Sequence, residues 1–167
     1  MLLKKNLQNL ILIRMKNISK HISFKEGVRS NTAMRLNLDN TPGDYHLANM
    51  EAVALNIFEP LREWVGGPIK INSFYRSVQL NKAIGGSERS QHCDGRAIDL
   101  DDTFGYKTNA EMYNYIKENL NFDQLIWEFG NEVNPDWVHV SYVSDDQNRN
   151  RCLKAERVNG RAVYSII

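Results

Sequence analysis

Two short segments that lie far apart in the sequence contain residue types that together can bind one metal ion. Residues 90–99 contain His92 and end at Asp99, and residues 137–141 are centred on His139. Two neutral imidazoles and one carboxylate form a ligand set typical of zinc, and a water molecule as fourth ligand makes such a site catalytic rather than structural. We therefore predict a catalytic site that holds one Zn²⁺ ion.

The local sequence around these residues explains how they can meet. Gly95 lies between His92 and Asp99, so the chain can turn sharply there and continue into a strand that carries Asp99. His139 lies in the middle of a second predicted strand, residues 137–142. Side chains alternate between the two faces of a strand, so each ligand points to one defined face. Any one of these residues alone is more often an ordinary partly buried side chain, and only the combination indicates a metal site.

The same residues also resemble the motifs of a known family. Ser-x-His-x-x-Gly-x-Ala-x-Asp at residues 90–99, followed by Trp-x-His-x-Ser at residues 137–141, resembles the zinc D-Ala-D-Ala carboxypeptidases. Relatives of that family are the D-Ala-D-Ala dipeptidases, the phage L-alanyl-D-glutamate endopeptidases and the hedgehog signalling fold. The resemblance extends over about residues 24–142. It implies that the two histidines and the aspartate are zinc ligands and that the substrate is a peptide stem of bacterial peptidoglycan.

A zinc peptidase also needs a carboxylate near the metal-bound water, to accept its proton and pass it to the leaving amine. The resemblance offers two candidates. Asp136 stands three residues before His139, as in the endopeptidases and dipeptidases, whereas Glu128 ends the apolar strand 124–128, as in the hedgehog-like members. Asp136 follows Pro135 in a loop, where an aspartate is typically solvated, whereas burial at the strand end would raise the pKa of Glu128. We favour Glu128 as the base and keep Asp136 as the alternative.

Three further residues are candidates for binding the substrate. Arg76 ends a Ser-x-Tyr-Arg segment, residues 73–76, in which the arginine of the family is taken to bind the substrate carboxylate. The planar guanidinium group suits that task. Phe74 stands where the family commonly has glycine. Ser90 and Gln91 are predicted to hydrogen-bond either to the substrate or to groups around the metal ligands. A purely structural role in the turn before His92 is the alternative.

The order of the elements predicts an α+β fold with a small antiparallel sheet and helices packed on one side, as in the hedgehog and DD-peptidase zinc fold. Apolar residues at three- and four-residue spacing predict a long amphipathic helix from residue 47 to 65, kinked at Pro60. Residues 108–111, Thr-x-x-Glu, form a capping box that opens another helix. Asn159-Gly160 suits the tight turn of a hairpin near the end of the chain.

Composition limits the possible partners. The chain has 167 residues with 21 Lys and Arg, 20 Asp and Glu and a net charge of +1, which argues against a nucleic-acid partner. Two cysteines are too few for a disulfide framework, and no segment is long enough to span a bilayer. We expect a monomer that acts on a peptide substrate.

The first part of the chain is predicted to lie outside the catalytic domain. Residues 1–20 are read as an N-terminal extension and residues 21–167 as a single zinc peptidase domain. Lys4 and Lys5 precede a short apolar run, residues 10–13, but no small-residue cleavage site follows. We therefore expect cytoplasmic synthesis without a signal peptide, with Met15 as an alternative start.

The leading hypothesis is a zinc-dependent metallopeptidase that hydrolyses peptidoglycan stem peptides, either carboxypeptidase-like or endolysin-like. A phage or bacterial enzyme of this kind acts at the cell wall and degrades it. One alternative is a non-catalytic, zinc-stabilised binding or structural module of a phage particle. Another is a cytosolic D-Ala-D-Ala dipeptidase.

Overall fold

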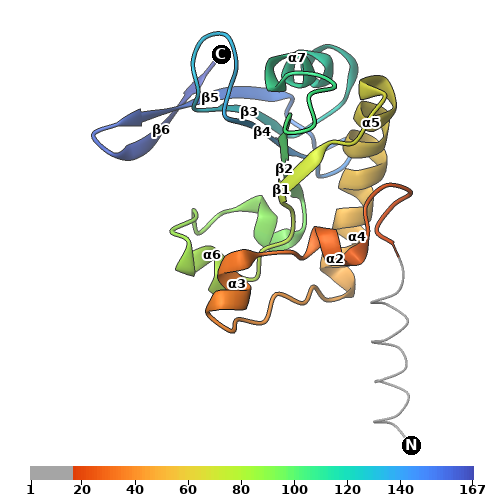
Figure 1. The fold of residues 1–167 in the computed structure, drawn as a ribbon, viewed down its shortest axis with the longest axis vertical. Coiled ribbons are helices and arrows are strands. Elements are labelled where there is room, and N and C mark those ends of the chain that lie inside the picture. Colours follow the sequence, from red (N-terminus) through yellow and green to blue (C-terminus); the bar gives the residue numbers. More distant parts are fainter. Residues whose placement is uncertain (1–16) are drawn as a thin grey trace, which may run out of the picture.

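The computed structural model describes residues 17–167, and these are organised around one six-stranded sheet (Figure 1). The strands, in their order across the sheet, are β1 (Lys70–Ser73), β2 (Ala97–Asp101), β4 (Trp137–Ser141), β3 (Gln124–Glu128), β5 (Arg151–Val158) and β6 (Arg161–Ile166). All neighbouring strands are antiparallel except β3 and β5, which run parallel. The chain reverses its direction between β3 and β4 and again between β4 and β5. β5 therefore runs in the same direction as β3, beside which it lies. The α+β prediction is confirmed, with a sheet that is mostly antiparallel.

The helices are short, apart from one long stretch before β1 and one helix before β3. They are α2 (Phe24–Gly27), α3 (Asn31–Arg35), α4 (Asp44–Val53), the π-helical turn η1 (Ala54–Phe58), α5 (Glu59–Val65), α6 (Val78–Ala83), the 3₁₀ turn η2 (Gln91–Asp94) and α7 (Asn109–Asn119). The predicted helix over residues 47–65 corresponds to α4, η1 and α5, which follow one another directly (Figure 1). Pro60 lacks a backbone N–H, and the backbone changes to π-helical geometry just before it.

Alternation along the strands gives the sheet two different faces. Ile98, Leu100 and Val138 point to the face that packs against α4, α5 and α7, where they are fully buried in the main hydrophobic core. Burying a side chain of this size stabilises the fold by about 1.5–3 kcal/mol. Asp99 and His139 are cross-strand partners and point to the opposite face. The core thus fixes the strands, and the strands present polar residues on the other side.

Two local predictions from the sequence correspond to capped or turned structures. Thr108 caps α7, since its side chain accepts from the backbone N–H of Glu111 while the Glu111 carboxylate accepts from that of Thr108. Asn159 and Gly160 connect β5 to β6 with φ angles of 50° and 76°. Two consecutive residues with positive φ are what a type I′ hairpin turn requires.

The boundary proposed at residue 20 falls close to the first described residues. Residues 1–16 of the expected extension lie outside the described part of the chain. Ile18 and Ile22 are buried in the main core, and the backbone N–H of Ile18 donates to the carbonyl of Ile22 at 2.9 Å. Packing against the main hydrophobic core therefore begins by Ile18.

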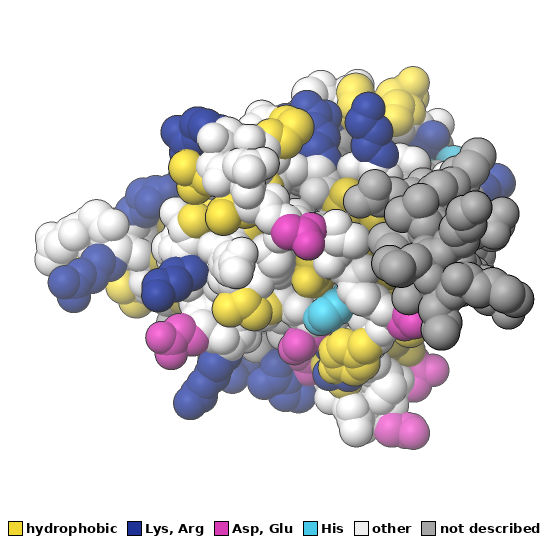
Figure 2. Space-filling model, turned by 90° about the horizontal axis from the view of Figure 1, so that it is seen from below, with side chains coloured by type: hydrophobic (Ala, Val, Ile, Leu, Met, Phe, Trp, Pro, Cys, Tyr) yellow, Lys and Arg dark blue, Asp and Glu magenta, His cyan; other side chains and the backbone are white. Residues whose placement is uncertain are grey.

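The surface of the described residues carries both charges. On the face shown in Figure 2, Lys and Arg side chains are interspersed with Asp and Glu and with small hydrophobic patches. No helix within residues 17–167 combines the length and apolar character needed to cross a membrane.

Candidate metal centre

Three side chains from three different elements converge on one point of the polar face of the sheet. His92 comes from η2, Asp99 from β2 and His139 from β4, and one ligand atom from each lies within 4.8 Å of the others. The Nε2 atom of His92 lies 3.2 Å from Nδ1 of His139 and 3.3 Å from Oδ2 of Asp99. His139 Nδ1 lies 2.9 Å from Asp99 Oδ1. The predicted triple is therefore brought together, with spacings that suit three ligands of a single ion.

Gly95 makes the turn that connects two of these residues. Its φ is +73°, a left-handed conformation that favours glycine, and its N–H donates to the carbonyl of His92 at 3.2 Å. A Cβ at this position would lie 2.6 Å from the backbone oxygen of His46 in α4. A glycine is thus required both by the backbone conformation and by the close approach of α4.

The environment of His92 leaves one ring nitrogen free for a metal. Its Nδ1 lies 2.6 Å from the carbonyl oxygen of Phe74, and since a carbonyl can only accept, Nδ1 carries the proton. The unprotonated Nε2 then faces Asp99 and His139, as in metal-binding histidines whose second nitrogen donates to a carbonyl. Burial lowers the pKa of His92, against the opposing effect of Asp99. The ring is therefore kept neutral, which is the form that binds a metal.

Asp99 is prepared to act as an anionic ligand. Burial alone would raise the pKa of its carboxyl group, but the adjacent rings of His92 and His139 together hold that pKa well below its usual range. The guanidinium of Arg76 also lies against it, with Nη2 3.3 Å from Oδ2. The set of one carboxylate and two imidazole nitrogens fits Zn²⁺ by its chemistry and its spacing.

The two candidates for the base have different surroundings. Glu128 is buried at the end of β3, with 6% of its surface exposed, and its cross-strand partner is Trp137. Burial raises the pKa of Glu128 to about 7; the charge of Asp99 adds to this effect, and His139 opposes it. Asp136 is exposed to solvent, and its backbone N–H donates to the carbonyl of Glu128. Glu128 therefore has the properties of a general base poised near neutral pH.

Two other predicted residues have structural contacts. The Gln91 side-chain amide donates to Asp123 Oδ2 at 2.8 Å, and Asp123 also accepts three hydrogen bonds from Arg149, two from its side chain and one from its backbone N–H. Ser90 is half-buried and precedes η2, where its carbonyl accepts from the N–H of Cys93. These contacts favour a role for Ser90 and Gln91 in holding the turn that carries His92.

Comparison with known proteins gives one result that bears on this geometry. The family model for peptidase M15 matches residues 19–141. The chain belongs to the peptidase M15 family. No curated protein matches the chain significantly.

The M15 family consists of zinc-dependent peptidases, and membership of it supports a metallopeptidase. The match includes all of the converging residues, from Arg76 to His139. It ends before β5 and β6, so the last two strands of the sheet lie outside the matched part of this M15 chain.

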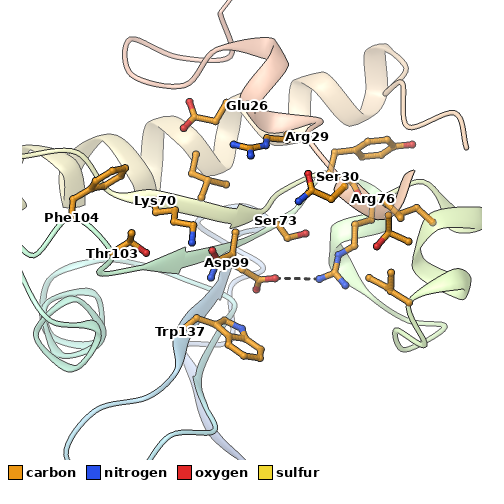
Figure 3. Close-up of a pocket in the computed structure, with 17 residues that line it drawn as sticks. Glu26, Arg29, Ser30, Lys70, Ser73, Arg76, Asp99, Thr103, Phe104 and Trp137 are labelled. Atoms are coloured by element: carbon orange, nitrogen blue, oxygen red, sulfur yellow. Dashed lines mark hydrogen bonds and ion pairs between the residues drawn. The ribbon is translucent and has the colours of Figure 1, made fainter. Parts of the chain in front are cut away.

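A cavity of about 760 Å³ opens beside the candidate ligands of the M15 chain (Figure 3). Asp99, Arg76 and Trp137 line it near the candidate ligands. β1, residues in and around α2, α3 and α6, and the segment after β2 line the rest. Figure 3 shows the side chains of Asp99 and Arg76 pointing toward each other at the edge of this space. The sequence did not reveal this cavity, because most of its walls come from segments outside the recognised motifs. It also did not reveal the role of the Phe74 carbonyl, because any residue type can supply a backbone oxygen.

Proposed function

We propose that this protein is a zinc peptidase that hydrolyses peptide bonds in the stem peptides of peptidoglycan. The substrate class rests on the likeness of its motifs to the D-Ala-D-Ala carboxypeptidases and the phage endopeptidases. Action at the cell wall, as an endolysin or as a bacterial wall-degrading enzyme, is part of the same proposal.

One observation carries this proposal. The ligand atoms of His92, Asp99 and His139 lie within 4.8 Å of one another, and burial raises the pKa of a fourth residue, Glu128, to about 7. A structural zinc site usually closes its shell with four protein ligands, whereas three ligands leave a position for water or substrate. In the described residues, no fourth His, Cys, Asp or Glu joins the cluster.

The reaction we propose divides the work among the residues of the chain. His92, Asp99 and His139 would hold the ion, and a bound Zn²⁺ supplies a Lewis acid that polarises a carbonyl and lowers the pKa of a bound water. Glu128, in its ionised form, accepts the proton of the attacking water. A pKa near 7 allows it then to donate that proton to the leaving amine.

Arg76 would orient the substrate through a carboxylate. Its side chain is 15% exposed, and its Nη2 lies 3.3 Å from Oδ2 of Asp99. Its buried Nε has no hydrogen-bond partner among the described residues. A buried donor without a partner is costly, by about 1–3 kcal/mol. The guanidinium fork has the planar geometry that binds a carboxylate of the substrate.

The proposal is tested on purified cell walls. The zinc-loaded protein should clear a wall-containing gel, a chelator should abolish clearing, and added zinc should restore it. Mass spectrometry of the released fragments then identifies the bond that is cleaved. A D-Ala-D-Ala dipeptidase would instead release alanine from the free dipeptide and leave the walls intact.

A Glu128→Gln variant provides the matched control, because it keeps the shape of the side chain and removes the base. Clearing by the parent protein but not by this variant supports the peptidase. Intact walls and intact stem peptides with the zinc-loaded parent protein would contradict the proposal and favour a non-catalytic zinc module.

A further inference from the structure

The outer edge of β1 offers unpaired backbone groups. β1 is the first strand of the sheet and pairs only with β2. Among residues 17–167, no other backbone or side-chain group forms a hydrogen bond to the main chain of Lys70–Ser73 on the opposite side. The next such bond occurs beyond the strand, where the N–H of Tyr75 donates to the carbonyl of Gly27. Within the described residues, the outer edge of β1, whose register with β2 shifts between Ile71 and Ser73, is therefore unpaired.

The cavity beside the metal ligands follows this edge. All four residues of β1 line it, although consecutive side chains of a strand point to opposite faces. Figure 3 shows Lys70 and Ser73 on one side of the strand and Glu26 and Arg29 on the other. A cavity that reaches both sides of an edge strand encloses the edge itself, and it continues to Asp99.

We propose that an extended stretch of the substrate docks along the free edge of β1 as an added strand. The main chain of the peptide exchanges hydrogen bonds with Lys70–Ser73. The peptide then crosses Ser73 to reach the candidate metal ligands. This inference rests on the proposed peptidase function and deepens it. Addition of a peptide to a sheet edge is a common mode of recognition, in which the main chain gives affinity.

The register of the sheet sets the length of substrate that this mode requires. Ser73 is the cross-strand partner of Asp99, so a peptide paired with β1 lies two strand spacings from β2. Two spacings amount to roughly 10 Å, which an extended chain covers in about three residues. The enzyme should therefore prefer substrates that extend at least about three residues beyond the scissile bond, as in a long stem peptide and unlike a free dipeptide.

The charges along the edge indicate an acidic peptide. Arg29 and Lys70 line the cavity on the two sides of β1, and Glu26 is the carboxylate beside them. Lys70 lies 4.0 Å from Asp101, at the limit of an ion pair, and 46% of its side chain is exposed. Both cations thus remain accessible to carboxylate groups of a bound peptide.

Hydrogen exchange of the backbone amides tests the docking directly. The zinc-loaded Glu128→Gln protein is mixed with an uncleaved stem pentapeptide, and binding is followed by tryptophan fluorescence. Outward-facing amides of residues 70–73 should exchange at least tenfold more slowly in the complex. A single N-methyl group on a paired amide of the peptide should weaken binding roughly three- to tenfold, at alternating positions only.

The results separate this inference from the peptidase function. Wall hydrolysis together with a bound peptide that leaves the β1 amides unprotected would overturn the docking mode and leave the peptidase intact. A peptide that neither binds nor is cleaved would overturn both. Protection of β1 in the peptide-free protein that grows with protein concentration would show that a second copy occupies the edge, which also contradicts the proposal.

The charge prediction has a matched pair of variants. Lys70→Met keeps the side-chain stem and removes the charge, and it should weaken binding of the acidic peptide roughly three- to tenfold. Lys117→Met changes an exposed lysine of α7 outside the cavity and should leave binding unchanged. Equal binding by both variants would contradict a role for Lys70.

Discussion

At the scale of single residues, the site contains two buried carboxylates whose surroundings act in opposite directions. The two histidines beside Asp99 hold the pKa of its carboxyl group low, whereas burial favours the protonated form of Glu128. Two titratable groups with pKa values pushed apart commonly divide the roles of ligand and proton carrier. Asp99 then suits the ligand role, and Glu128 suits proton transfer.

The division of roles predicts unequal effects of two similar substitutions. Glu128→Gln should lower kcat by about 10²- to 10⁴-fold, the usual contribution of a general base. Asp136→Asn should change kcat by less than about threefold, because the side chain is exposed. Steady-state kinetics on a stem peptide, with the zinc content of each variant measured, gives the comparison. The reverse order of effects would assign the base to Asp136.

Glu128 also predicts how the stability of the metal-free protein depends on pH. Its pKa is about 7 in the folded protein and 4.5 in the unfolded chain. Between these values the folded state holds the proton that the unfolded state has lost, so the free energy of unfolding falls as pH rises from 4.5 to 7. Glu128→Gln should remove this loss, which amounts to about 3 kcal/mol.

Urea unfolding of the chelator-treated protein at pH 4 and pH 8 measures that difference. Asp136→Asn is the control and should follow the parent protein at both pH values. Equal pH dependence in the parent protein and Glu128→Gln would show that the environment of Glu128 does not favour its protonated form.

At the scale of elements, the turn between η2 and β2 fixes the spacing of two candidate ligands. Gly95 and Gly85 both have a positive φ, of 73° and 71°. A Cβ at Gly85 meets nothing within 4 Å, whereas one at Gly95 would collide with the backbone of α4. A substitution at Gly85 therefore reports the cost of the backbone conformation alone. A substitution at Gly95 adds the cost of the clash with α4.

Alanine substitutions at these glycines should differ in size and in kind. Gly85→Ala should cost about 1–2 kcal/mol of stability, the usual penalty for a left-handed residue with a Cβ. Gly95→Ala should cost roughly 3 kcal/mol or more and weaken zinc binding about tenfold, because α4 or the His92 turn must move. Denaturant unfolding and competition with a zinc chelator measure both effects. Equal losses for the two variants would mean that α4 yields without disturbing the turn.

The sequence predicts the individual strands and helices better than it predicts how the strands pair. The apolar strand 124–128, the alternating strand 137–141 and the Thr108 capping box were predictable, because they depend on local chemistry. The convergence of the three candidate ligands followed from motifs with defined spacing. The parallel pairing of β3 with β5 and the free edge of β1 depend on which strands become neighbours, which no local pattern specifies.

At the scale of the whole molecule, the metal site ties together segments distant in the chain. His92 comes from the turn η2 and His139 from strand β4, so an ion held by both links them in the folded state only. A ligand that binds only the folded state stabilises it by about 2.7 kcal/mol at a concentration 100 times its Kd. Zinc binding should thus be visible as a gain in stability.

The gain should depend on the candidate ligands and on no other histidine. Zinc should raise the unfolding temperature of the parent protein, and His139→Ala should lose nearly all of that increment. His21→Ala is the control, since His21 pairs with Glu59 at the surface and should keep the increment. Thermal unfolding with and without a chelator measures it. A full increment in His139→Ala would place the ion elsewhere.

The extent of the domain provides a last prediction, because the family match ends at residue 141 although the sheet continues. In β5, Leu153 and Ala155 are buried against Ile126 of β3, whereas every residue of β6 is exposed. Removing residues 159–167 should therefore leave a cooperatively folded protein, whereas removing residues 151–167 should expose the edge of β3 together with its apolar neighbours and abolish cooperative unfolding. Circular dichroism during heating distinguishes the two truncated proteins. Cooperative unfolding of the shorter one would show that the matched segment folds without β5.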